Sequence, residues 1–107
     1  MKELSRYLVI ITGSYAKKEA TKNSDLDVVV VVDNENPLGI QKLLDNLMFL
    51  FHPKVHLYVF KAKDFIEMLL SKEENYGKEI FRNHLILKNA YIYYEILKEA
   101  IENGFKS

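Results

Sequence analysis

The chain of 107 residues contains no cysteine, carries no net charge and has no long apolar segment. Without cysteine it can form no disulfide, zinc–thiolate site or thiol nucleophile, and we expect a cytoplasmic location. Fifteen basic side chains are matched by fifteen acidic ones. Net charge therefore provides no attraction to nucleic acid, which we do not expect as a partner. The apolar runs are shorter than a signal-peptide core or a membrane-spanning helix requires, so we expect no membrane association.

Composition and length indicate one globular domain. Hydrophobic residues make up 49% of the chain and charged residues 28%, an ordinary balance for a protein with a buried core. A chain of this size buries roughly two-thirds of its unfolded surface, enough for one sizeable core. The sequence contains no repeat, low-complexity stretch or long linker. We therefore expect residues 1–107 to fold as a single domain.

Apolar, β-branched segments predict the strands. The strongest candidate is Leu26–Val32, which is apolar at odd and even positions alike. Both of its faces should therefore be covered, as in the central strand of a layered α/β sheet. The expected strands are Tyr7–Thr12, Leu26–Val32, Val55–Phe60 and a brief edge strand over His84–Leu87.

Apolar residues at helical spacing predict the segments between the strands. Asn36 is a favourable cap and Pro37 a favourable first residue, so a helix should begin there, pack one face on the sheet and stop at Pro53. Its expected apolar face consists of Ile40, Leu43, Leu44, Leu47, Met48 and Phe51. Other helices are expected over Tyr15–Ala20, Asp64–Leu70, Lys78–Asn83 and Ala90–Glu102, with Gly104 in the C-cap region of the last.

Two aspartates precede the run of five valines. Side chains alternate along a strand, so Asp25 and Asp27 should project to one face with Cα atoms roughly 6 to 7 Å apart. Two like charges so close together are tolerable when a cation lies between them. Mg²⁺ suits such a pair, because it usually takes one or two protein carboxylates and completes its coordination with water and phosphate oxygens. The pair therefore predicts a metal site that also receives a phosphate.

A Gly-Ser turn after the first strand supplies a matching phosphate site. Gly13 permits a close approach of the backbone, and Ser14 offers a hydroxyl. Backbone amides at the start of a following helix would point at an anion. Taken singly, a Gly-Ser turn is often only a turn and an aspartate before a strand is often only a solvated strand end. The combination of both motifs at a fixed separation is much more specific.

Ten residues separate Ser14 from Asp25, and strands flank both motifs. The stretch "GSYAKKEATKNSDLDVVVVV" thereby resembles the active-site signature of the DNA polymerase β-like nucleotidyltransferase superfamily, particularly its minimal nucleotidyltransferases. The resemblance extends more weakly over "KDFIEMLL" and "HLILKN", and so covers most of the chain. It implies an α/β (α+β) fold with a small mixed central sheet flanked by helices, like the palm of polymerase β.

The resemblance also implies a reaction and a set of site residues. A nucleoside monophosphate, with AMP from ATP as the expected case, would be transferred to an acceptor while pyrophosphate leaves. Asp25 and Asp27 would hold Mg²⁺ or Mn²⁺, and catalysis would consist mostly of positioning and electrostatics. Lys17 and Lys18 would touch the triphosphate, although solvated surface lysines are an equally good reading. The implied nucleotide-binding residues are Gly13, Ser14, Tyr15, Lys17 and Lys18.

The chain departs from the family pattern at the third carboxylate, which normally lies on the strand after the helix. In "KVHLYVF" the two positions that could align are His56 and Tyr58, and neither is acidic. Asp33 lies six residues beyond Asp27, roughly 20 Å along an extended strand, and cannot substitute. Asp64 follows the strand and would need a fold-back to reach the metal.

Three interpretations are compatible with this departure. His56 could ligate the metal or act as the catalytic base, which would favour a borderline cation such as Mn²⁺ over Mg²⁺. The site could work with two carboxylates and an acceptor activated by other means. The chain could also bind nucleotide and metal without turnover. A strand histidine is more often a hydrogen-bonded structural residue than a ligand.

An alternative function is that of an interaction protein. Minimal nucleotidyltransferases often pair as antitoxins with a helical HEPN-domain toxin, and some modify it with AMP. Tyr91, Tyr93 and Tyr94 share the last predicted helix and indicate either ordinary packing on the sheet or a surface for a partner or a homodimer. Family members normally carry a full helix before the first strand, whereas here only residues 1–6 precede it, so one flank of the sheet should be less covered. A nucleic-acid polymerase is disfavoured by size and charge.

Overall fold

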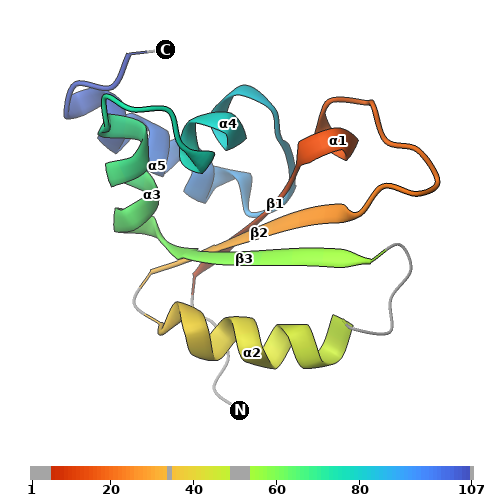
Figure 1. Cartoon of the computed structure of the whole chain (residues 1–107). Coiled ribbons are helices and arrows are strands. Elements are labelled where there is room, and N and C mark those ends of the chain that lie inside the picture. The colour runs from red at the N-terminus through yellow and green to blue at the C-terminus, as the bar shows by residue number, and fades with distance from the viewer. Residues whose placement is uncertain (1–5, 34, 49–53, 107) are drawn as a thin grey trace.

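The structure, a computed structural model, describes residues 6–33, 35–48 and 54–106 (Figure 1). A four-stranded sheet lies at its centre and helices cover both faces. This is the α/β (α+β) arrangement with a small sheet that the sequence predicts. In chain order the elements are β1 (Tyr7–Thr12), α1 (Gly13–Ala16), β2 (Leu26–Val32), α2 (Pro37–Met48), β3 (Val55–Lys61), α3 (Ala62–Leu70), α4 (Tyr76–Arg82), β4 (Leu85–Lys88) and α5 (Ala90–Glu102).

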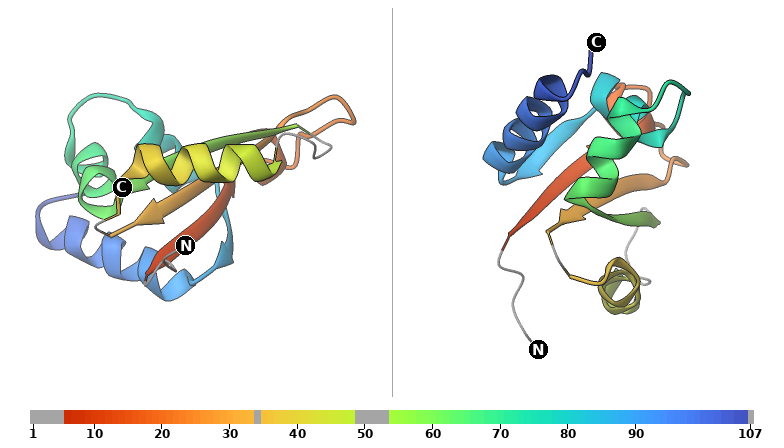
Figure 2. Two further views of the ribbon diagram at one scale, coloured as in Figure 1. Left: turned by 90° about the horizontal axis from the view of Figure 1, so that it is seen from below. Right: turned by 90° about the vertical axis from the view of Figure 1, so that its left-hand side faces the viewer.

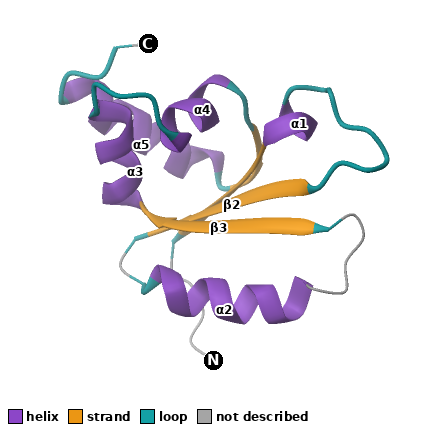
Figure 3. Cartoon of the chain, viewed as in Figure 1, coloured by secondary structure: helices purple, strands orange, loops and turns teal. Residues whose placement is uncertain are grey.

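The sheet is mixed, with the strand order β3-β2-β1-β4. β1 runs antiparallel to both β2 and β4, whereas β2 and β3 are parallel (Figure 3). Parallel neighbours need a crossover connection, and α2 provides it on one face of the sheet. β2 is a central strand, as its uninterrupted apolar run predicts.

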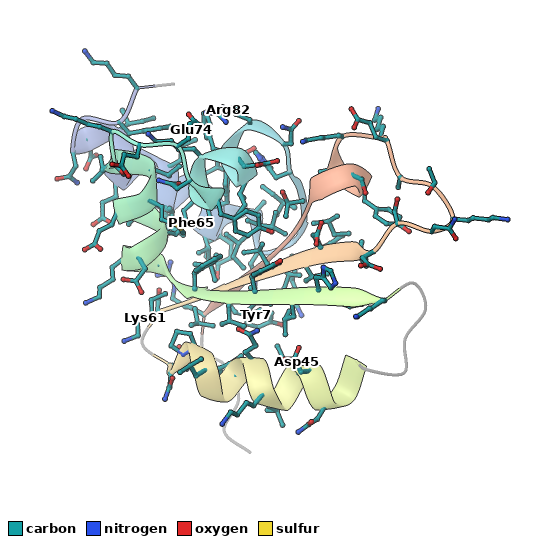
Figure 4. All side chains as sticks on the ribbon, viewed as in Figure 1. Tyr7, Asp45, Lys61, Phe65, Glu74 and Arg82 are labelled. Carbon is teal, nitrogen blue, oxygen red and sulfur yellow. The ribbon has the colours of Figure 1, made fainter. Side chains whose placement is uncertain are left out.

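The valines of β2 belong to two separate cores because alternate side chains point to opposite faces. Val29 and Val31 join a cluster with Leu8, Ile10 and Phe65 on the face covered by α3, α4 and α5. Phe65 is fully buried and extends from α3 toward the sheet (Figure 4). The second cluster lies under α2 (Figure 2) and contains Val28, Val30, Val32, Leu57 and Val59. Burial on both faces makes β2 the rigid centre of the sheet.

The α2 helix begins at Pro37, as predicted, and Ile40 and Leu44 pack against the second cluster. Leu43, which the spacing placed on the same apolar face, is instead partly exposed. The predicted stop at Pro53 lies outside the described ranges, as does Phe51, and the side chains of Leu47 and Met48 are not described. The expectation about residues before the first strand also falls mostly on residues 1–5, which lie outside those ranges.

The predicted helix Tyr15–Ala20 is wrong in its bounds. The α1 helix spans only Gly13–Ala16. It cannot continue because Lys18 adopts a left-handed backbone conformation, with φ of 61°, that breaks a right-handed helix. The amide of Glu19 then donates to the carbonyl oxygen of Ser14 at 2.8 Å and closes the turn. α1 is therefore a single turn attached directly to β1.

The α4 helix begins at Tyr76, two residues before the predicted start at Lys78. Asn75 is the reason, because its side chain accepts a hydrogen bond from the amide of Lys78 and caps the helix. The helix ends at Arg82, one residue early, and β4 covers Leu85–Lys88 in place of His84–Leu87. β3 ends at Lys61, one residue later than predicted, and α3 starts at Ala62, two residues earlier than predicted. α5 has the predicted bounds, and Gly104 follows it with φ of 107°.

In the described ranges no helix is long and apolar enough to cross a membrane.

Candidate active site

Asp27 is the centre of the candidate site. It lies in β2 between Thr12 at the end of β1 and His56 near the start of β3, and the three residues are cross-strand partners. Cross-strand partners project to the same face of a sheet, so these side chains form a row across three strands. The row lies at the end of the sheet from which α1 emerges (Figure 1). The sheet thus joins the Gly-Ser turn, the carboxylates and the histidine in one place.

The backbone of Gly13 lies directly against the Asp27 carboxylate. Its φ is 71°, and a Cβ atom at this position would lie 2.2 Å from Oδ2 of Asp27. Glycine is therefore required here for two independent reasons, the left-handed conformation and the space that Asp27 occupies. Thr12 anchors the turn from the other side, since its buried hydroxyl donates to the carbonyl oxygen of Asn83 at 3.1 Å.

His56 contacts both aspartates. Its Nε2 lies 3.1 Å from Oδ2 of Asp25, and its Nδ1 lies 3.5 Å from Oδ1 of Asp27. The two carboxylates therefore share one face, as the alternation of side chains predicts. The Asp27 side chain is 27% exposed, and those of Asp25 and His56 are 42% and 41% exposed. All three are open enough to meet a ligand from solvent.

Asp25 and Asp27 are the predicted metal ligands. One oxygen of each carboxylate lies within ion-pair distance of the His56 ring, so the two carboxylates lie close together. The residues within the described ranges include no cluster of three or more acidic, histidine or cysteine side chains already spaced as metal ligands. The carboxylates would thus supply two ligands, and phosphate and water oxygens would supply most of the rest, as Mg²⁺ prefers.

The other predicted nucleotide-binding residues are distributed around α1. Ser14 and Tyr15 belong to the helical turn itself and are partly buried. Lys17 turns toward α4, where its Nζ lies 3.2 Å from Oε1 of Glu79. Lys18 is exposed in the following turn. The structure therefore brings Gly13 to the Asp27 carboxylate, with Ser14 next to it in the chain, but leaves Lys17 paired with an acidic side chain.

Two tyrosines form an aromatic wall beside the carboxylates, and we use that name for Tyr58 and Tyr76. Their ring centroids are 5.0 Å apart with an interplanar angle of 57°. Tyr58 follows His56 on the same face of β3, and Tyr76 reaches this face from the start of α4. Burial raises the pKa of Tyr76 well above its ordinary value, and the negative charge of Asp27 raises it further. The Tyr76 hydroxyl oxygen is buried and has no hydrogen-bond partner among the described residues.

A family model described as "Nucleotidyltransferase domain" matches residues 1–103. The chain belongs to this family. The match confirms the membership of the polymerase β-like nucleotidyltransferases that the spacing of Gly-Ser and the two aspartates indicates. A search of curated proteins found no match.

A solved structure shares the fold of this nucleotidyltransferase domain. It is described as "Crystal structure of the toxin-antitoxin with AMP-PNP", and the alignment has a TM-score of 0.58 and covers 89% of this chain and 71% of that one. The sequences are 15% identical. At this identity the likeness shows that the two chains share a fold.

The structure also locates the two acidic residues considered as a third ligand, Asp33, which the sequence excluded, and Asp64, which would need a fold-back. Asp33 follows the last residue of β2, at the opposite end from Asp27, and pairs with Arg6 at 3.3 Å. Asp64 lies in the first turn of α3, which follows the far end of β3. The position opposite Asp27 on β3 is His56. In the described part of this nucleotidyltransferase domain, a histidine therefore stands beside the aspartates where the family pattern has a carboxylate.

Alternation along the strand placed Tyr58 on the same face as His56 already in the sequence. Sequence reasoning missed the packing of Tyr76 on Tyr58 and the Lys17–Glu79 pair. No local signal of this kind existed for Tyr76 or Glu79. They reach the site only because α4 packs across the face that also carries Asp27.

We predict that Gly13→Ala disrupts the site. The added methyl group would have to displace the Asp27 carboxylate, and the left-handed conformation alone would cost about 1–2 kcal/mol. The variant should therefore be less stable in urea denaturation. Gly39→Ala is the matched control, because a Cβ there meets nothing within 4 Å. It lies inside α2, where alanine should be neutral or stabilise the protein by about 0.5–1 kcal/mol. Equal stability of Gly13→Ala and wild type would contradict the described packing.

Proposed function

We propose that this nucleotidyltransferase transfers AMP from ATP to a hydroxyl acceptor in a reaction that depends on a divalent cation. The observation that carries the proposal is the placement of Gly13 and His56 on either side of Asp27. A phosphate held at the Gly-Ser turn would lie against one side of the carboxylate pair. The other side remains for the α-phosphate and the attacking hydroxyl.

Each residue of the site has a role in this proposal. The amides of the turn and the hydroxyl of Ser14 would hold the β- and γ-phosphates, and because α1 is one turn long, its dipole would add little. Asp25 and Asp27 would hold Mg²⁺ or Mn²⁺, which when bound neutralises phosphate charge. The acceptor oxygen forms a bond to the α-phosphorus, and the bond to pyrophosphate breaks. His56 would accept the proton of the acceptor hydroxyl.

Transfer should depend on both carboxylates. With ATP labelled at the α-phosphate, Asp25→Asn and Asp27→Asn should each reduce label transfer to background, while ATP labelled at the γ-phosphate should label nothing even with wild type. Asp64→Asn is a matched control, since Asp64 lies beyond the far end of β3. It should retain the wild-type rate. Label transfer that survives both substitutions in the site would exclude the proposed reaction.

The rate should depend on residue 56 with either Mg²⁺ or Mn²⁺, because His56 would act as the base. His56→Ala should lower the rate about 10²- to 10⁴-fold, the usual range for loss of a general base. The measurement is the initial rate of label transfer, with Mg²⁺ and Mn²⁺ at the same concentration. A His56→Ala variant as fast as wild type with both metals would show that His56 has no catalytic role.

A second candidate function is that of an antitoxin that binds a HEPN-domain protein in the cytoplasm. The surface that favours it lies on α5. Tyr91 and Tyr94 are 56% and 60% exposed, whereas Tyr93 between them is buried. The structurally similar protein described above belongs to a toxin–antitoxin pair. The exposed side of α5 that carries Tyr91 and Tyr94, the α5 surface, would meet the partner.

Binding to such a partner should require the α5 surface and not the active site. In co-expression with a HEPN-domain protein from the same genome, Tyr91→Glu combined with Tyr94→Glu should abolish co-elution in size-exclusion chromatography. Asp27→Asn should leave it intact. Leu38→Glu is the control, because Leu38 is an exposed apolar residue on α2. If wild type alone elutes as a dimer that the double variant dissociates, the surface serves self-association instead.

A further inference from the structure

Tyr58 presents an exposed aromatic ring on the face of β3 that carries the active site. Its neighbours in sequence, Leu57 and Val59, are buried in the core under α2, so Tyr58 points to the opposite face with His56. The side chain is 39% exposed although the strand is flanked by helices on both faces. Burying the ring would be favourable, and an exposed aromatic ring beside a carboxylate pair is a candidate contact for a planar ligand.

The ring of Tyr58 is held in place by a second ring behind it. Tyr76 packs against Tyr58 and also against Phe60, with a centroid separation of 6.1 Å from the latter. Tyr76 is in turn fixed by Asn75, which caps α4 and donates from its side chain to the carbonyl oxygen of Met68 at 2.8 Å. A ring supported in this way loses little conformational entropy when a ligand stacks on it.

The position of Tyr58 relative to Asp27 suits a nucleoside. Asp27 is the cross-strand partner of His56, and Val29 is the partner of Tyr58, so Tyr58 lies one side-chain step, roughly 6 to 7 Å, further along the sheet. The Gly-Ser turn lies on the β1 side of Asp27 and Tyr58 on the β3 side. A nucleotide whose α-phosphate lies at Asp27 and whose other phosphates lie at the turn would extend its ribose and base toward β3.

We propose that Tyr58 is the stacking surface for the nucleobase of the donor nucleotide. This inference rests on the proposed function. Stacking on an aromatic ring is tolerant of base identity, because every base has a π face. With Tyr58, the protein would thus bind nucleoside triphosphates more tightly than inorganic tripolyphosphate. It would not select strongly among bases.

The test compares two probes that differ in the nucleoside. Magnesium complexes of α,β-methylene ATP and of inorganic tripolyphosphate are titrated into wild type and variants by calorimetry. Tyr58→Ala should bind the ATP analogue about tenfold more weakly than wild type while its affinity for tripolyphosphate is unchanged. Tyr58→Phe keeps the ring and should bind the analogue as wild type does. Leu38→Ala, on α2, controls for loss of an exposed apolar side chain.

The outcomes separate the two proposals. If wild type binds the ATP analogue and Tyr58→Ala binds it equally well, the stacking role is overturned and the proposed function stands. If Tyr58→Ala loses affinity for both probes alike, the residue supports the fold of the site, and the stacking role is again overturned. If wild type binds neither probe, both proposals fail. Circular dichroism of each variant establishes that its secondary structure matches wild type.

Discussion

The pairing register of β1, β2 and β3 is the constraint on which the site depends. It places Thr12, Asp27 and His56 side by side and brings the backbone of Gly13 against the Asp27 carboxylate. A run of five valines cannot define such a register by itself, since a shift of one residue would exchange one apolar face for another. The residues at the ends of β2 must therefore define the register. A shift of one residue would turn Asp27 toward the apolar cluster under α2, and burying an unpaired carboxylate there is costly.

The two cores have different consequences for the site. The cluster under α2 is built from Val28, Val30 and Val32 of β2 and from Leu57 and Val59 of β3. On the other face, the cluster around Phe65 does not include Asp27, which is approached by Gly13 of α1 and by Tyr76 of α4. Lys17 and Glu79 join these two helices at the surface. Because exposed ion pairs contribute little free energy, this contact adds little to the stability of the fold.

The histidine at position 56 lies opposite Asp27 on β3, and its two ring nitrogens face the two aspartates. Asp33 and Asp64 lie at the other end of the sheet. The candidate site therefore combines two carboxylates and one imidazole, with the aromatic wall of Tyr58 and Tyr76 beside them.

The sequence by itself determined the family, the order of the main elements and the combination of a Gly-Ser turn, Gly13-Ser14, with the two aspartates Asp25 and Asp27. These features are local: alternation along a strand, helical spacing, and two motifs ten residues apart. Errors arose where a single backbone or capping interaction sets a boundary, as with Lys18 after α1 and Asn75 before α4. Only the tertiary structure decided that Lys17 pairs with Glu79 and that Tyr76 packs on Tyr58. Both contacts join segments far apart in the chain, and their geometry depends on how α4 crosses the sheet, which no local pattern in the sequence specifies.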